Sequence, residues 1–199
     1  MTGTGLRERK KAETRSALRE TAVSLAHRDG PDAITVEQVC AAVGVSARTF
    51  FNYFASKDDA LFGVDAGVLS AIVADVVARP AAEDPATALI TVLHDLLSDA
   101  AGSSVWHDQL ALIRDHPEVL PRLDDAQRAL ERACTEAVSL RTGRLDLDAH
   151  TTAAAVLAAQ RVAVAAWREQ PDGPGPDVLF ERSAALVRSG LDLPTHPSS

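Results

Sequence analysis

Apolar side chains recur three and four residues apart along most of the 199-residue chain, the pattern of helices with one buried face. Over residues 6–27, for example, Leu18, Ala22 and Leu25 form such a stripe. Pro and Gly residues interrupt the pattern and separate the segments. Helices of this kind are expected over residues 6–27, 56–78, 85–100, 104–115, 117–141, 148–169 and 176–190.

Two shorter helices are predicted within residues 35–57, which read TVEQVCAAVGVSARTFFNYFASK. Thr35, followed three residues later by Gln38, fits a capping box that begins the first of them. Gly44 lies where the chain must turn, because glycine adopts positive φ without a steric penalty. Ser46 is a good cap for the second helix. With these two, the sequence predicts an all-α fold of about nine helices and no strand.

The second short helix presents polar and aromatic side chains on its outer face. Phe50 and Phe54 are four residues apart and should both point inward. The side chains left on the outer and leading faces are Ala47, Arg48, Thr49, Phe51, Asn52 and Tyr53. A tight glycine turn between two short helices is the helix-turn-helix plan, in which one helix lies in the major groove of DNA.

At this segment the chain resembles a known family. The stretch AAVGVSARTFFNYFASKDDALF is similar to the DNA-binding signature of TetR-type (tetracycline-repressor-like) transcriptional regulators, and GLRERKKAETRSALRETAVSLAHRDG is similar to their first helix. The likeness covers roughly residues 6–64. It implies a helix-turn-helix DNA-binding domain of three helices over residues 1–57. It also implies a helical effector-binding and dimerisation domain over residues 58–199.

Four outward side chains have groups that can read base edges. Arg48 can donate two hydrogen bonds to guanine O6 and N7, and Asn52 can pair with adenine or reach a phosphate. Thr49 and Ala47 can each contact a thymine methyl group or a phosphate. We therefore expect these residues to carry the choice of DNA sequence.

Four further residues are candidates for DNA contacts, three of them because of the family resemblance. Phe51 and Tyr53 match positions where an aromatic ring packs on the DNA backbone or on a base methyl group. Lys57 matches a widely used phosphate clamp at the start of the next helix. Thr35 can contact a phosphate in addition to capping its own helix.

The charge of the chain is divided unevenly. The net charge is −8, but residues 1–57 carry nine basic and six acidic side chains. A basic cluster crowds the start of the first helix, where acids are normally favoured. Its members are Arg7, Arg9, Lys10, Lys11 and Arg15. One explanation is that DNA phosphates lie close to the cluster, because local positive charge drives DNA affinity. The alternative is a basic helix end that is solvated by water.

The last two predicted helices are candidates for a dimer interface. The first of them contains AAAVLAAQRVAVAAW, whose small side chains let helices approach closely. The resemblance implies that both helices pair with their mates as a four-helix bundle, giving a homodimer on a palindromic operator. A dimer doubles the base contacts of one short helix. A core helix inside a monomer is the alternative.

A small-molecule effector is implied by the resemblance. Its candidate cavity would be lined by Phe62, His94, Trp106, His107 and Leu110. Because few aromatic side chains follow Phe62, an aliphatic or acyl-type effector is expected. Binding would shift the helix after Ser56 and release the DNA. Ordinary core packing is the alternative for each residue.

Motifs for catalysis and for metal binding are absent from the sequence. It contains no GxSxG, P-loop or dinucleotide fingerprint and no HxxxH or CxxC spacing, so neither enzymatic activity nor a cofactor is expected. The polar start, the lack of a long apolar run and the two distant cysteines favour a reduced, cytoplasmic protein. The chain is thus predicted to be a bacterial, ligand-responsive repressor. One alternative is a helical enzyme or metal-dependent sensor whose N-terminal domain only resembles a DNA-binding domain. A second alternative is a transcriptional activator.

Overall fold

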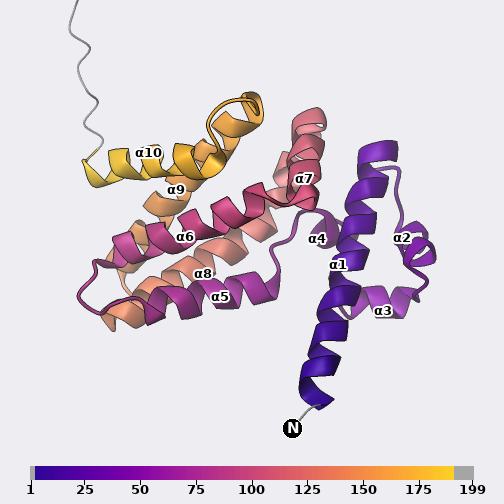
Figure 1. The fold of residues 1–199 in the computed structure, drawn as a ribbon, viewed down its shortest axis with the longest axis horizontal. Coiled ribbons are helices and arrows are strands. Elements are labelled where there is room, and N and C mark those ends of the chain that lie inside the picture. The colour runs from indigo at the N-terminus through magenta and orange to yellow at the C-terminus, as the bar shows by residue number, and fades with distance from the viewer. Residues whose placement is uncertain (1–2, 191–199) are drawn as a thin grey trace, which may run out of the picture. The chain divides into compact units, whose positions relative to one another are not determined.

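The computed structural model describes residues 3–190, and within that range the chain forms ten α-helices, one 3₁₀ helix and no strand (Figure 1). The all-α prediction is confirmed. The elements are α1 (Gly3–Asp29), α2 (Val36–Val43), α3 (Ala47–Phe51), α4 (Lys57–Phe62), α5 (Ala66–Ala78), α6 (Pro85–Ala101), α7 (Ser104–Asp115), the 3₁₀ helix η1 (Pro117–Leu123), α8 (Asp124–Thr142), α9 (Leu147–Glu169) and α10 (Pro176–Arg188). None of the described helices has both the length and the apolar content that crossing a membrane requires.

The helices form two compact units. The first contains the chain up to Val64 together with residues Ser104–Ala126, so α7 and η1 belong to it. In this unit α1 packs against α2, α4 and α7, and η1 packs against α4 and α7. Its core includes fully buried side chains from four helices and from the connection between α3 and α4: Leu18, Phe50, Phe54, Leu61 and Leu112.

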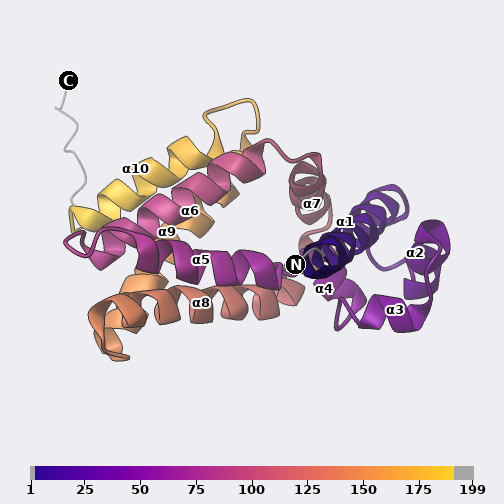
Figure 2. The same cartoon turned by 60° about the horizontal axis from the view of Figure 1, so that its bottom comes forward.

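The second unit contains Asp65–Ser103 and the chain from Gln127 onward. In it α10 packs along α9 and α6, and α6 packs against α5 and α9 (Figure 2). Aliphatic side chains fill its interior, with Phe180 as a fully buried aromatic residue. The boundary expected between residues 57 and 58 stays a prediction; the compact units divide the chain differently, because the segment 104–126 packs with α1 and α4.

The single helix expected over residues 56–78 is wrong, because the structure has two helices there. Gly63 has extended backbone angles (φ −65°, ψ 145°) and ends α4. Asp65 then begins α5, since its carboxylate accepts a hydrogen bond from the N–H of Gly67 at 2.6 Å. A side chain at position 63 would meet the carboxylate of Asp59 at 2.1 Å. The sequence signal for the break is therefore glycine followed by a capping aspartate.

The helix expected over residues 117–141 also differs at its start. Residues Pro117–Leu123 form the 3₁₀ helix η1, with Pro121 inside it, and the α-helix begins only at Asp124. Proline supplies no backbone N–H, so it interrupts the hydrogen bonds of an α-helix. The remaining helix ends agree with the expected ranges to within a few residues.

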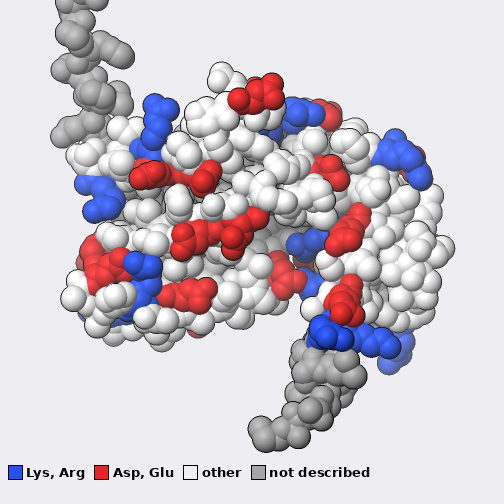
Figure 3. Space-filling model, viewed as in Figure 1, with Lys and Arg blue, Asp and Glu red and all other residues white. Residues whose placement is uncertain are grey.

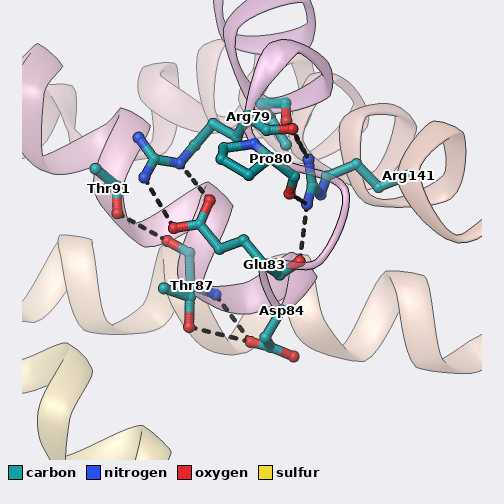
Figure 4. A network of polar contacts seen from close by, with 8 residues as sticks. Arg79, Pro80, Glu83, Asp84, Thr87, Thr91 and Arg141 are labelled. Atoms are coloured by element: carbon teal, nitrogen blue, oxygen red, sulfur yellow. Dashed lines mark hydrogen bonds and ion pairs between the residues drawn. The ribbon is translucent and has the colours of Figure 1, made fainter.

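One arginine organises the turn between α5 and α6 in the second unit (Figure 4). The guanidinium of Arg141, on α8, donates to the carbonyl oxygens of Val76 and Arg79 at 3.0 Å each. It also donates to those of Pro80 and Glu83 at 2.8 Å each. The end of α5 thus receives a positive charge where its carbonyl groups lack helical partners, which favours that conformation.

Candidate nucleic-acid interface

Local hydrogen bonds define the two short helices as the sequence predicts. The Thr35 hydroxyl accepts from the N–H of Gln38 at 3.2 Å, and the Gln38 side chain accepts from the N–H of Thr35 at 2.8 Å. Gly44 adopts the left-handed conformation (φ 77°) and donates its N–H to the carbonyl of Cys40 at 2.9 Å. The Ser46 hydroxyl caps α3 by accepting from the N–H of Thr49 at 3.1 Å.

The underside of α3 is held by two buried aromatic rings. Phe50 and Phe54 are almost completely shielded from solvent, with ring centroids 5.5 Å apart, so the inward prediction is confirmed. The guanidinium groups of Arg15 and Arg19 lie 4.6 and 5.5 Å from the centre of the Phe54 ring. Such cation–π contacts are attractive and orient the ring. Helix α1 therefore stabilises the buried side of α3 through the contacts of these two arginines with the Phe54 ring.

The predicted DNA-contacting side chains of α3 lie on its accessible side. Ala47, Arg48, Phe51 and Asn52 are exposed, while Thr49 and Tyr53 are half-buried. Phe51 exposes 57% of its surface, which is unusual for a large apolar residue. The Thr49 hydroxyl lies 3.0 Å from that of Ser46, so its methyl group is the freer part of the side chain. Thr35 is also exposed, at the start of α2.

Lys57 has contacts within the protein that the sequence did not indicate. Its ammonium group donates to the carbonyl oxygens of Pro31 at 2.7 Å and Ile34 at 3.0 Å. An ammonium group has three N–H donors, so one remains for a phosphate. Lys57 therefore joins the start of α4 to the connection between α1 and α2, whatever it does with DNA.

A cleft of about 370 Å³ lies between α1 and the end of α3. Its lining residues are Lys10, Lys11, Thr14, Asn52 and Tyr53. Figure 3 shows the basic side chains gathered near the first described side chains of α1. Two ammonium groups and an amide around one hollow suit an anionic group such as a phosphodiester, whereas the Thr14 hydroxyl donates to the carbonyl oxygen of Lys10 at 2.9 Å. Thr14 was not predicted, because only the fold brings it to Asn52.

The other members of the basic cluster have different surroundings. Arg9 pairs with Glu13 at 3.4 Å on the same helix. Arg15 donates to the carbonyl oxygen of Tyr53 at 2.7 Å, so it fixes the end of α3. The side chain of Arg7 lies outside the described residues.

Four of the five candidate effector-cavity residues lie in the first unit. Phe62 on α4 and Leu110 on α7 are buried, and Trp106 and His107 on α7 are half-buried. His94 lies on α6 in the second unit, with its Nδ1 atom 3.4 Å from a carboxylate oxygen of Asp95. A hollow of about 140 Å³ in the second unit is lined by other residues, at the start of α6 and around the turn between α8 and α9. The effector cavity stays a prediction.

Both cysteine side chains are buried thiols. Burial raises the pKa of the Cys40 thiol, and it raises that of Cys134 to about 12. The reactive thiolate form is therefore disfavoured at neutral pH in both. Among the residues that the structure describes, no group of His, Cys, Asp and Glu is placed to hold a metal ion.

Two family models match most of the chain. Residues 18–63 match the model described as bacterial regulatory proteins of the tetR family, and residues 83–192 match the one described as the MftR C-terminal domain. The second match alone covers more than half of the chain. The chain belongs to the TetR family of bacterial regulatory proteins.

Known TetR-family proteins are similar over most of the chain. The transcriptional regulator TcmR of Streptomyces glaucescens is 29% identical over 153 residues, which is 73% of this chain and 67% of that protein. Thermus thermophilus FadR, a repressor solved with lauroyl-CoA, has a TM-score of 0.60 at 20% identity and covers 93% of this chain and 98% of its own. SmeT, repressor of the Stenotrophomonas maltophilia efflux pump SmeDEF, has a TM-score of 0.60 at 14% identity, covering 92% and 96%.

The solved structures establish the fold, and the family match establishes the class of function. The protein is a DNA-binding transcriptional regulator of the TetR family. Its matched N-terminal region contains α2 and α3 and ends just after α4.

Proposed function

We propose that this TetR-family protein is a repressor that binds a palindromic operator as a homodimer and is released by a small-molecule effector. The observation that carries the proposal is the outer side of α3. It exposes Arg48, Phe51 and Asn52 between a capped start and a basic cleft at its end. Its place of action is the cytoplasm, where bacterial DNA lies.

Each exposed residue of α3 has a role in this proposal. Arg48 reads guanine, Asn52 pairs with adenine or a phosphate, and Ala47 and the Thr49 methyl group contact thymine. Phe51 and Tyr53 pack on the DNA backbone. The remaining donor of Lys57, the Thr35 hydroxyl and the two lysines of the cleft neutralise or bind phosphates. Phosphate contacts position the helix, and base contacts choose the sequence.

The proposed dimer interface is the exposed face of α9 and α10. Residues about one helical turn apart on α9 are exposed and mostly small or apolar: Leu147, Thr151, Ala154, Val162 and Ala166. On α10, Val178 and Ala185 are exposed as well. Leu147 exposes 78% of its surface and Val162 60%. Exposed apolar residues of this kind favour association with another protein surface.

For the effector we propose an aliphatic or acyl-type molecule. The support is the scarcity of aromatic side chains after Phe62. The structural relative FadR from Thermus thermophilus is solved with lauroyl-CoA, which has an acyl chain. The candidate lining residues are Phe62, Trp106, His107 and Leu110 in the first unit and His94 in the second.

Selection of bound duplexes from a random pool, at one stated salt concentration, tests the proposal. We expect a motif with two-fold symmetry whose half-sites are one helical turn of DNA apart or a multiple of it. Sedimentation of the free protein should give the mass of a dimer. A protein that is monomeric and binds all duplexes equally would contradict both the homodimer and the palindromic operator.

A further inference from the structure

The segment 104–126 is distant in sequence from the helix-turn-helix but lies in the same compact unit. Helix α7 packs along α1, and η1 packs against α4. The side chain of Gln109 donates to the carbonyl oxygen of Leu61, in the last turn of α4, at 2.6 Å. The segment is thus part of the framework that holds the DNA-reading helices.

Arg122, in η1, contacts both flanks of α2 and α3. Its Nη2 atom donates to the Asp32 carboxylate at 2.5 Å, and Asp32 lies in the connection that leads into α2. Its Nη1 atom lies 3.7 Å from Oδ1 of Asp58, in the first turn of α4. One guanidinium group therefore joins the segment that enters the helix-turn-helix to the helix that leaves it.

Asp58 places one shielded oxygen at this contact, although its side chain as a whole is 39% exposed. Its Oδ1 atom is shielded from solvent and accepts no hydrogen bond from the described residues. The guanidinium of Arg122, whose side chain is 27% exposed, is the positive charge beside it. The hydrogen bond to Asp32 raises the pKa of Arg122, so the guanidinium stays charged. Removing it would leave this shielded oxygen without a positive charge beside it, at a cost that the exposure of the rest of the Asp58 side chain reduces.

We propose that Arg122 is a positioning residue for operator recognition, which holds the two flanks of the helix-turn-helix in the orientation that α3 needs. The inference rests on the proposed function, since it concerns how the same helix is presented to DNA. Lys57 joins the same two flanks through the carbonyl oxygens of Pro31 and Ile34.

The experiment compares full-length Arg122→Ala with the matched control Arg114→Ala. Arg114 lies on α7 and pairs only with its neighbour Asp115 at 2.9 Å among its described ion pairs. Operator affinity is measured for the selected duplex and for a random duplex over a series of salt concentrations. We expect Arg122→Ala to lose about three- to tenfold in the ratio of specific to non-specific affinity, and the control to keep it.

Two further readouts separate positioning from direct DNA contact and from general destabilisation. The slope of affinity against salt should not change in Arg122→Ala, because a positioning residue neutralises no phosphate. Adding Asp58→Asn should restore part of the lost ratio, since it removes the uncompensated carboxylate. A smaller salt slope, or an Arg122→Ala ratio equal to that of the control, would overturn the proposal.

Amide hydrogen exchange tests, without DNA, whether Arg122 holds the two flanks of the helix-turn-helix in place. Exchange over residues 30–35 and 57–62 should be about fivefold faster in Arg122→Ala than in the control. Equal exchange in both variants would show that Arg122 does not hold the two flanks in place. If the unaltered protein prefers no duplex while this difference in exchange remains, the proposed function fails and the role of Arg122 in holding the two flanks stands.

Discussion

The two compact units differ in how side-chain hydrogen bonds to distant backbone groups are distributed. In the unit with α2 and α3, side chains bind backbone groups that are far away in the sequence. Arg15 binds the carbonyl of Tyr53, Gln109 binds that of Leu61, and Lys57 binds two carbonyls before α2. Such hydrogen bonds are directional, so they set the orientation of the helices and not only their proximity.

The second unit combines apolar packing between its helices with hydrogen bonds of the same kind, which Arg141 donates at one turn. Aliphatic side chains of α5, α6, α9 and α10 fill its interior, and Arg141 supplies four hydrogen bonds to one turn. Apolar burial is not directional. The difference teaches that hydrogen bonds from several helices orient α3, whereas in the second unit one arginine orients a single turn. The changes below test that difference.

The largest effect is expected from removing an aromatic ring under α3. Phe54→Ala deletes a buried side chain and the ring beneath Arg15 and Arg19, so the free energy of unfolding should fall by about 3–5 kcal/mol. Denaturant unfolding measures the loss. Hydrogen exchange should locate it in the first unit. If α9 and α10 lost as much protection from exchange as the first unit, the distinction between the units would be contradicted.

The corresponding change in the second unit is Arg141→Met. It removes the four hydrogen bonds at the end of α5 but keeps the length of the side chain, and about 1.5–3 kcal/mol of stability should be lost. The control is Arg144→Met, whose exposed ion pair with Asp146 should contribute less than about 1 kcal/mol. Equal losses in the two variants would show that the turn does not depend on Arg141.

Arg48→Ala should change DNA recognition without changing stability. The side chain is exposed, so unfolding should shift by less than about 0.5 kcal/mol. Preference for the selected duplex should fall by about 1–3 kcal/mol at one base position. Denaturant unfolding measures the stability, and repeating the DNA selection with the variant measures the loss of preference and its base position. As a control, Arg28→Ala removes a cation that pairs with its neighbour Asp29 and should leave the preferred sequence unchanged.

The cleft between α1 and α3 should contribute to affinity but not to sequence choice. In the Lys10→Ala, Lys11→Ala double variant, the slope of log affinity against log salt should shrink by about 0.9 for each phosphate no longer neutralised. Titrations at several salt concentrations measure it. Arg9→Ala is the control, because Arg9 is paired with Glu13. A changed base preference in the double variant would mean that the cleft contacts bases.

The smallest effect is expected from Glu83→Gln in the second unit. The hydrogen bond from Arg79 lowers the pKa of Glu83, so the ionised carboxylate stabilises the folded state. This stabilisation is present above the pKa of the unfolded chain and is lost as the pH falls through the lower, folded value. The variant should therefore be less stable than the parent at about pH 7 and equally stable at about pH 2. A difference that persists in acid would assign the contact to packing.

The sequence by itself determined the elements whose signals are local. The caps at Thr35 and Ser46 and the turn at Gly44 follow from neighbouring residues, and Phe50 and Phe54 follow from helical spacing. The all-α class and the outer face of α3 could therefore be predicted. The break at Gly63 was also marked locally, by glycine and a capping aspartate, and was missed.

Only the tertiary structure decided which distant segments meet. It placed Thr14 beside Asn52, the Lys57 ammonium on two carbonyl oxygens, and Arg122 between two carboxylates. Such contacts join residues tens of positions apart and arise from the packing of whole helices, to which no spacing along the chain corresponds. A charged side chain has the same identity whether it faces phosphate or a carbonyl group, and its surroundings in the fold decide between the two.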